Sequence, residues 1–143
     1  MNSMQLWIIY ALLSAVFAAL VAIFGKIGIQ NVDSTLATAV RAVVMALFLF
    51  FVVLSMGKLP LLSSINNKAL LFIILSGLAG AISWVFYFMA LKNGPATSVA
   101  ALDRLSIVFV LVFSLLLLGQ KFTWGSGLGA ALMAIGAILM SLN

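Results

Sequence analysis

The stretch ALLFIILSGLAGAISWVFYFMAL at residues 69–91 contains no charged residue and decides the fold class. At about 1.5 Å per residue, a helix of this length crosses the roughly 30 Å hydrocarbon core of a bilayer. Four further apolar runs lie on either side of it, at residues 6–24, 36–56, 97–118 and 124–142. The sequence therefore predicts an all-α integral membrane protein with five transmembrane helices.

Composition supports this fold class and limits the partners. Hydrophobic residues make up 66% of the 143, against seven Lys or Arg and two Asp or Glu, which is too little polar surface for a water-soluble domain. The net charge of +5 is carried by basic residues spaced singly along the chain, with no cluster to follow a phosphate backbone. We expect a lipid bilayer and a small-molecule solute as partners, and no nucleic acid.

The connections between the runs are short, which makes consecutive helices antiparallel neighbours. The sequence predicts one compact bundle and a single domain over residues 1–143, with the two termini on opposite membrane faces. Asp33 or Ser34 is predicted to cap the second helix, with Asp33 favoured, and Thr123 is predicted to cap the fifth. Gly94 is predicted to end the third helix in a left-handed conformation, just before Pro95.

The basic residues are almost evenly divided between the two faces. We call the face that holds the amino terminus face A and the opposite one face B. The members of face A are Lys58, Lys68 and Lys121; those of face B are Lys26 and Lys92, with Arg41 and Arg104 slightly inside the membrane. Because the Lys and Arg bias sets orientation, this near tie fits dual topology or a weakly biased single orientation.

Three charged residues lie within the apolar runs, where charges are costly and often functional: Arg41, Asp103 and Arg104. Arg41 follows Ser34 by seven residues and Asp103 follows Pro95 by eight, so both lie roughly 10 Å below face B. One hypothesis is an Arg41–Asp103 ion pair that lines a polar substrate cavity, together with Arg104. The alternative is that both arginines extend to the headgroups and Asp103 neutralises one of them.

Aromatic residues are concentrated in the third run. Ser83 and Trp84 lie near the middle of the membrane, and Tyr87 follows Ser83 by one helical turn. An indole N–H at that depth needs a partner, which favours a cavity where Trp84 and Tyr87 stack on a planar or apolar solute. The alternative is packing among helices or against lipid.

Small residues at spacings of four mark surfaces on which helices approach each other. They are Ser76 and Gly80 in the third run, and Gly125 and Gly129 in the fifth, with Gly136 seven residues further along the same face. The fifth helix is predicted to be a dimer or repeat interface, and packing within one subunit is the alternative.

Catalysis is not expected. The chain has no His and no Cys, and it lacks paired membrane carboxylates, a metal-ligand cluster and a phosphate-binding loop. We predict no enzyme, no cofactor and no metal site. Asp103 is followed directly by Arg104, and a neighbouring cation favours a permanently ionised carboxylate. Asp103 is therefore a poor candidate for a residue that couples transport to protons.

Two sequence motifs carry a family resemblance. KNGPATSVAALDRLSIVFV at 92–110 and SLLLLGQKFT at 114–123 resemble the EamA family of the drug/metabolite transporter superfamily. FGKIGI at 24–29, VDS at 32–34 and residues 37–41 resemble the first helical hairpin of the same domain. Members usually carry two such domains as an inverted repeat, whereas this chain resembles the half-size, five-helix branch. Together with the near-even division of basic residues between the two faces, the resemblance implies an antiparallel homodimer with a central cavity, in a bacterial inner membrane.

The chain departs from the family pattern at two positions. Gln120 stands where the family often has Glu, and Ile107 stands where many members have Pro, which leaves the predicted helix 97–118 without a proline break. The four-helix multidrug exporters of the superfamily use an acid in their first helix, and this chain has none there. The sequence favours a small-metabolite transporter or facilitator with alternating access; the alternative is a non-transporting membrane subunit of a larger complex.

Overall fold

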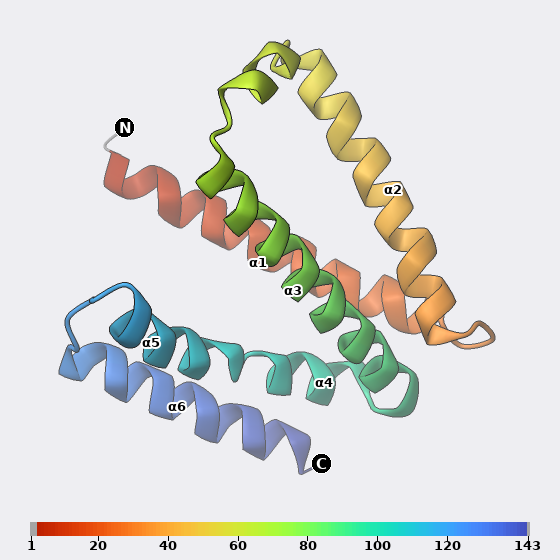
Figure 1. Ribbon diagram of the computed structural model, residues 1–143. Coiled ribbons are helices and arrows are strands. Elements are labelled where there is room, and N and C mark those ends of the chain that lie inside the picture. The colour runs from red at the N-terminus through yellow and green to blue at the C-terminus, as the bar shows by residue number, and fades with distance from the viewer. Residues whose placement is uncertain (1–2, 143) are drawn as a thin grey trace. The chain divides into compact units, whose positions relative to one another are not determined.

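A computed structural model describes residues 3–142 of the chain (Figure 1). Its elements are α1 (Ser3–Gly28), α2 (Ser34–Ser55), the 3₁₀ helix η1 (Leu59–Ser64), α3 (Asn67–Asn93), α4 (Ala96–Asp103), α5 (Ser106–Leu117) and α6 (Trp124–Ser141). No strand occurs within residues 3–142. In this described part of the chain, five helical spans are long and apolar enough to cross a membrane, with α4 and α5 together forming the fourth. The predicted all-α membrane fold with five transmembrane helices is confirmed.

The helices begin and end where their sequences allow. Asp33 Oδ1 accepts a hydrogen bond from the Leu36 N–H at 2.9 Å, and Thr123 Oγ1 accepts one from the Ser126 N–H at 3.2 Å, so both predicted N-caps are confirmed. The left-handed residues of the described chain are Gly57 and Gly119, where α2 and α5 end. The left-handed conformation predicted for Gly94 is wrong, because Pro95 in an extended conformation starts α4 directly.

Backbone contacts divide the chain into two compact units. One contains α1 as far as Ile27 together with Asn93–Asn143, and the other contains Gly28–Lys92. We describe each unit by itself. The predicted assembly of all five spans into one bundle, with termini on opposite faces, stays a prediction.

In the unit that contains α4, α5 and α6, the last helix packs along the other two (Figure 1). The buried or half-buried residues of α6 are small: Gly127, Ala130, Ala134, Ala137 and Ser141 follow one another at spacings of three and four, and Gly136 is also half-buried. Ser98 of α4 adds a hydrogen bond from its Oγ to the Met140 carbonyl of α6, at 3.0 Å. Small side chains thus bring these helices into close contact.

The glycines predicted as an interface lie elsewhere on α6. Gly129 and Gly136 each precede a buried alanine by one residue, which places them about 100° around the helix from the packed face. Among the described residues, no atom lies within 4 Å of a Cβ built at Gly125, Gly129 or Gly136. Gly125 and Gly129 are exposed and Gly136 is half-buried, so packing within this unit is centred on a different face. The role of the three glycines in a dimer stays a prediction.

The fourth crossing is interrupted, although the sequence predicts one helix over 97–118. The N–H groups of Arg104 and Leu105 donate to the carbonyls of Ala101 and Leu102, three residues back, instead of four. This tighter turn separates α4 from α5 without a proline. The absence of proline at Ile107 therefore does not give an unbroken helix, and the expectation of one is wrong.

In the unit Gly28–Lys92, α2 and α3 are joined through η1 and separate toward it (Figure 1). Their opposite ends are fixed near face B, where Lys92 Nζ donates a hydrogen bond to the Val32 carbonyl. Ile29 and Leu91 are buried at this end. The two helices are therefore anchored at one end and apart at the other.

Candidate functional site

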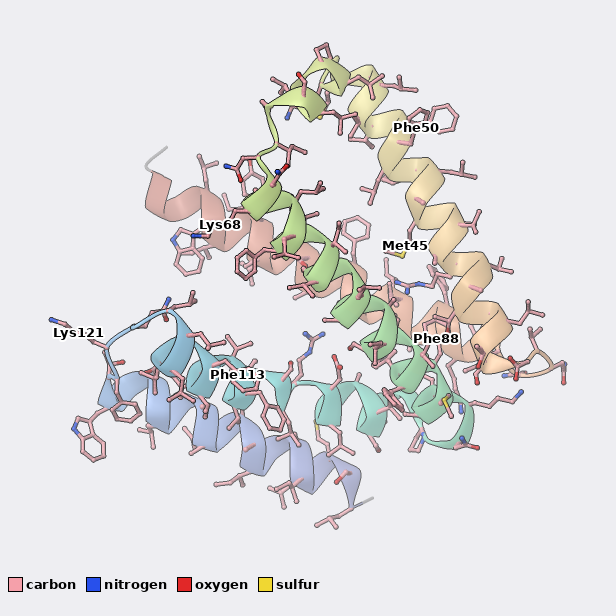
Figure 2. All side chains as sticks on the ribbon, in the orientation of Figure 1. Met45, Phe50, Lys68, Phe88, Phe113 and Lys121 are labelled. Atoms are coloured by element: carbon pink, nitrogen blue, oxygen red, sulfur yellow. The ribbon has the colours of Figure 1, made fainter. Side chains whose placement is uncertain are left out.

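Arg41 is the one charged residue of α2, and the capped start of that helix determines its depth. It follows Ser34 by seven residues, so it lies roughly 10 Å below the helix start. Its side chain is half-buried. Met45, one turn further along the same helix face, extends from α2 on the side that faces α3 (Figure 2). Arg41 therefore lies on the side of α2 that faces α3.

The guanidinium of Arg41 lies over the indole ring of Trp84 on α3. Its Cζ is 3.4 Å from the ring centroid, and it is 5.4 Å from the centroid of Phe88. A cation over an aromatic face is attracted by the ring quadrupole, and the attraction grows when water is excluded. The structure thus brings together two residues that the sequence predicted separately, Arg41 and Trp84, in a contact that the sequence analysis did not predict.

Phe88 is the residue of this cluster that sequence reasoning missed. It is 3% exposed, and it follows Trp84 by four residues, which places the two on the same side of α3. The contact between Arg41 and Trp84 could have been predicted from the antiparallel arrangement of α2 and α3. Trp84 precedes Asn93 by nine residues, which places it roughly 13 Å below the end of α3, within reach of an arginine at the depth of Arg41.

The rings of this cluster hold one another in place. Trp84 and Tyr87 meet edge to face, with centroids 5.6 Å apart, and Tyr87 and Phe88 do the same at 6.2 Å. Trp84 and Phe88 lie 6.0 Å apart. Tyr87 is half-buried, whereas Ser83 is exposed. Arg41 covers one face of the Trp84 ring. A solute that stacks on Trp84, as the sequence predicted, could therefore use only the opposite face.

The N–H groups of the Arg41 guanidinium have no hydrogen-bond acceptor within the unit Gly28–Lys92. Within Gly28–Lys92, all of which the structure describes, no hydrogen bond or ion pair engages the guanidinium. The one acid in this segment is Asp33, which accepts the Leu36 N–H at the helix start, eight residues before Arg41. Arg41 is therefore a cation stacked on Trp84 whose N–H groups make no hydrogen bond within Gly28–Lys92.

The lysines near face B are engaged in a different way. Lys26 Nζ donates to the Gly94 carbonyl at 2.8 Å, and Lys92 donates to the Val32 carbonyl. Each bond ties a helix end to a connection of its own unit. These lysines stabilise the connections, whereas Arg41 is held within the apolar part of a helix.

Asp103 and Arg104 lie at the interruption between α4 and α5, and both are exposed. The turn there frees backbone groups of the fourth crossing from the regular helical pattern. Asp103 belongs to the other unit than Arg41, so the Arg41–Asp103 ion pair stays a prediction. The structure thus supplies one group of candidate residues around Arg41 and a second at the break.

Comparisons with known proteins agree with the fold. Residues 5–142 match the EamA-like transporter family. The chain is 45% identical over 138 residues to a protein from a Sinorhizobium species named "Uncharacterized transporter in cobO 3'region". That alignment covers 96% of this chain and 98% of the other. No solved structure matches the chain.

Proposed function

Since the chain belongs to the EamA-like transporter family, we propose that it moves a small metabolite by alternating access, as an antiparallel homodimer of five-helix halves. The observation that carries the proposal is the Arg41 guanidinium held on Trp84 inside a membrane-spanning hairpin. A charged side chain at such depth is costly, and it is found where a protein handles polar solutes. The place we propose for the protein is a bacterial inner membrane.

The dimer would supply the second half of an inverted repeat. An odd number of crossings puts the ends of the chain on opposite faces, and a second copy inserted the other way would complete ten helices around one cavity. The near tie between the lysines of the two faces supports insertion in both orientations. The relative from Sinorhizobium is aligned over 98% of its length, which supports a half-size unit.

We assign the cavity to the residues around Arg41 and at the fourth-crossing break: Arg41, Ser83, Trp84, Tyr87, Asp103 and Arg104. The faces that we assign to assembly carry Ser76 and Gly80 on α3 and Gly125, Gly129 and Gly136 on α6. Support for these faces is the open space around the four glycines, which leaves room for another helix to approach.

Solute flux tests transport. Purified protein in liposomes loaded with a bacterial metabolite extract is expected to deplete particular solutes, measured by mass spectrometry of the retained contents. Liposomes without protein are the control for leakage, and Arg41→Gln is the test variant. If wild-type liposomes retain every solute that empty liposomes retain, transport by this protein alone is contradicted and the non-transporting subunit is favoured.

Orientation tests the dimer. The chain has no cysteine, so single Asn31→Cys and Gln120→Cys variants report the α1–α2 and α5–α6 connections cleanly. A membrane-impermeant thiol reagent is applied to cells before and after permeabilisation. We expect each site to be labelled partly in intact cells and fully after permeabilisation. Labelling of one site only from outside and the other only from inside would establish a single orientation and contradict the antiparallel homodimer.

A further inference from the structure

The charge balance inside the membrane leaves an uncompensated cation. The charged residues of the spans away from their ends are Arg41, Asp103 and Arg104, two cations and one acid. Two guanidinium groups outnumber the one carboxylate, so these segments carry a net positive charge. An unpaired charge in an apolar environment is costly, so a mobile anion that enters the site lowers the free energy of the protein.

The stack on Trp84 determines what Arg41 offers to that anion. With its Cζ 3.4 Å from the ring centroid, one flat side of the guanidinium is covered by the indole. The N–H donors of a guanidinium lie in its plane, at its edges, and these edges carry no hydrogen bond within Gly28–Lys92. A planar fork of donors matches the two oxygens of a carboxylate or a phosphate.

The same contact disfavours a cationic solute. Aromatic rings bind ammonium groups through their faces, and one face of Trp84 is already occupied by Arg41. A second cation beside the first would also be repelled. The cluster of Trp84, Tyr87 and Phe88 therefore supports Arg41 instead of forming a cage for an amine.

We propose that the transported solute carries an oxyanion group, a carboxylate or a phosphate, which binds the guanidinium edge of Arg41 while Trp84 holds that guanidinium in place. The inference rests on the proposed function, because it names the substrate class of the same site. Arg41 is the residue that selects anions over amines, and Trp84 is a positioning residue.

Direct binding tests this without a transport assay. In a Trp7→Phe, Trp124→Phe background, Trp84 is the remaining tryptophan, so its fluorescence reports the site. The protein is purified in dodecyl maltoside without phosphate and titrated with benzoate, acetate, inorganic phosphate and benzylamine. We expect a saturable change with at least one of the three anions and none with benzylamine. Saturable binding of benzylamine, or of none of the anions, would overturn the proposal.

Variants identify the residue responsible. Arg41→Gln is expected to weaken anion binding by at least about tenfold, since a buried charge-assisted hydrogen bond is lost. Arg41→Lys keeps the charge without the planar fork and is expected to restore binding only partly. Lys68→Gln, at the start of α3 far from Trp84 in sequence, is the matched control and should bind as the parent does (Figure 2). Equal anion affinity in Arg41→Gln and parent, with both folded by circular dichroism, would overturn the assignment.

Lipid phosphate is another source of the same chemistry. Adding phosphatidylglycerol to the micelles is expected to leave anion binding unchanged; displacement of the anion from the parent protein, but not from Arg41→Gln, would show that a headgroup occupies Arg41 instead. The experiments distinguish failure of the proposed transport function from failure of the proposed anion site. Arg41-dependent anion binding without flux would contradict transport alone, whereas flux of amines without anion binding would contradict the anion site alone.

Discussion

Two helix pairs in this protein are held together in opposite ways. α6 packs along α4 and α5, and its buried residues are the small side chains Ala130 and Ala137. Between α2 and α3 the contact described above is made by long side chains, with Arg41 reaching Trp84 and Phe88. Figure 1 shows this second pair separating toward η1.

The difference follows from lipid as the solvent. Lipid tails are as apolar as leucine, so helices do not associate by burying large apolar side chains and instead pack best where small residues permit close approach. In the α2–α3 pair, side chains of Arg41, Trp84 and Phe88 fill the distance between the backbones. We infer that the α6 contact is structural, and the α2–α3 pair stays the place where we propose that a solute binds.

The largest expected effect comes from enlarging the small-residue contact. Ala137 is 5% exposed on α6, and Ala137→Leu would force that helix away from its neighbours. Overpacking of this kind costs about 1–3 kcal/mol. We expect a clearly lower Tm for the variant in detergent, followed by circular dichroism.

Ala131→Leu is the matched control, because Ala131 lies on the same helix and is exposed. Its Tm should stay close to the wild-type value, since the same enlargement there does not meet the packed face. Equal losses of Tm in the two variants would contradict the assignment of the packed face.

A smaller effect is expected when the long-range contact between α2 and α3 is broken. A double-mutant cycle of Arg41→Met and Trp84→Leu is expected to give a coupling of about 1–2 kcal/mol in the free energy of unfolding. The same cycle with Phe86→Leu, an exposed ring on α3, should give none. A coupling at Trp84 as small as that at Phe86 would mean that the stack does not join the two helices.

The sequence predicted the elements of both regions better than their contacts. The five apolar runs and the caps at Asp33 and Thr123 are local signals, and the structure confirms them. Arg41 and Trp84 are each predicted to be functional from their own chemistry at membrane depth, but their contact depends on the register between two helices. Helices made almost entirely of apolar residues specify that register weakly, which is why the sequence did not predict the stack or the role of Phe88.

Prediction also failed where backbone geometry changes without a marker residue. The break at Arg104 and Leu105 contains neither Gly nor Pro, so propensity alone gives one helix through it. On α6, the sequence analysis predicted the contact face from the regular spacing of glycines, whereas the packed face is mostly alanine. Alanine is common throughout an apolar helix, so its periodicity carried less signal than the glycine pattern.

The smallest expected effect concerns the polar bond that accompanies the small-residue contact. Ser98 of α4 donates to the Met140 carbonyl of α6, whereas Ser141 donates to the Ile138 carbonyl within its own helix, at 2.7 Å. Both are serines bonded to backbone, but only Ser98 joins two helices. Interhelical hydrogen bonds in membranes contribute about 0.6 kcal/mol on average, so Ser98→Ala is expected to lower the Tm slightly. Ser141→Ala should leave the Tm nearly unchanged, because the Ile138 carbonyl belongs to a terminal turn that headgroups and water can reach. If Ser141→Ala lowered the Tm as much as Ser98→Ala, the bond would add nothing specific to the contact, and the small side chains alone would hold α6 against α4.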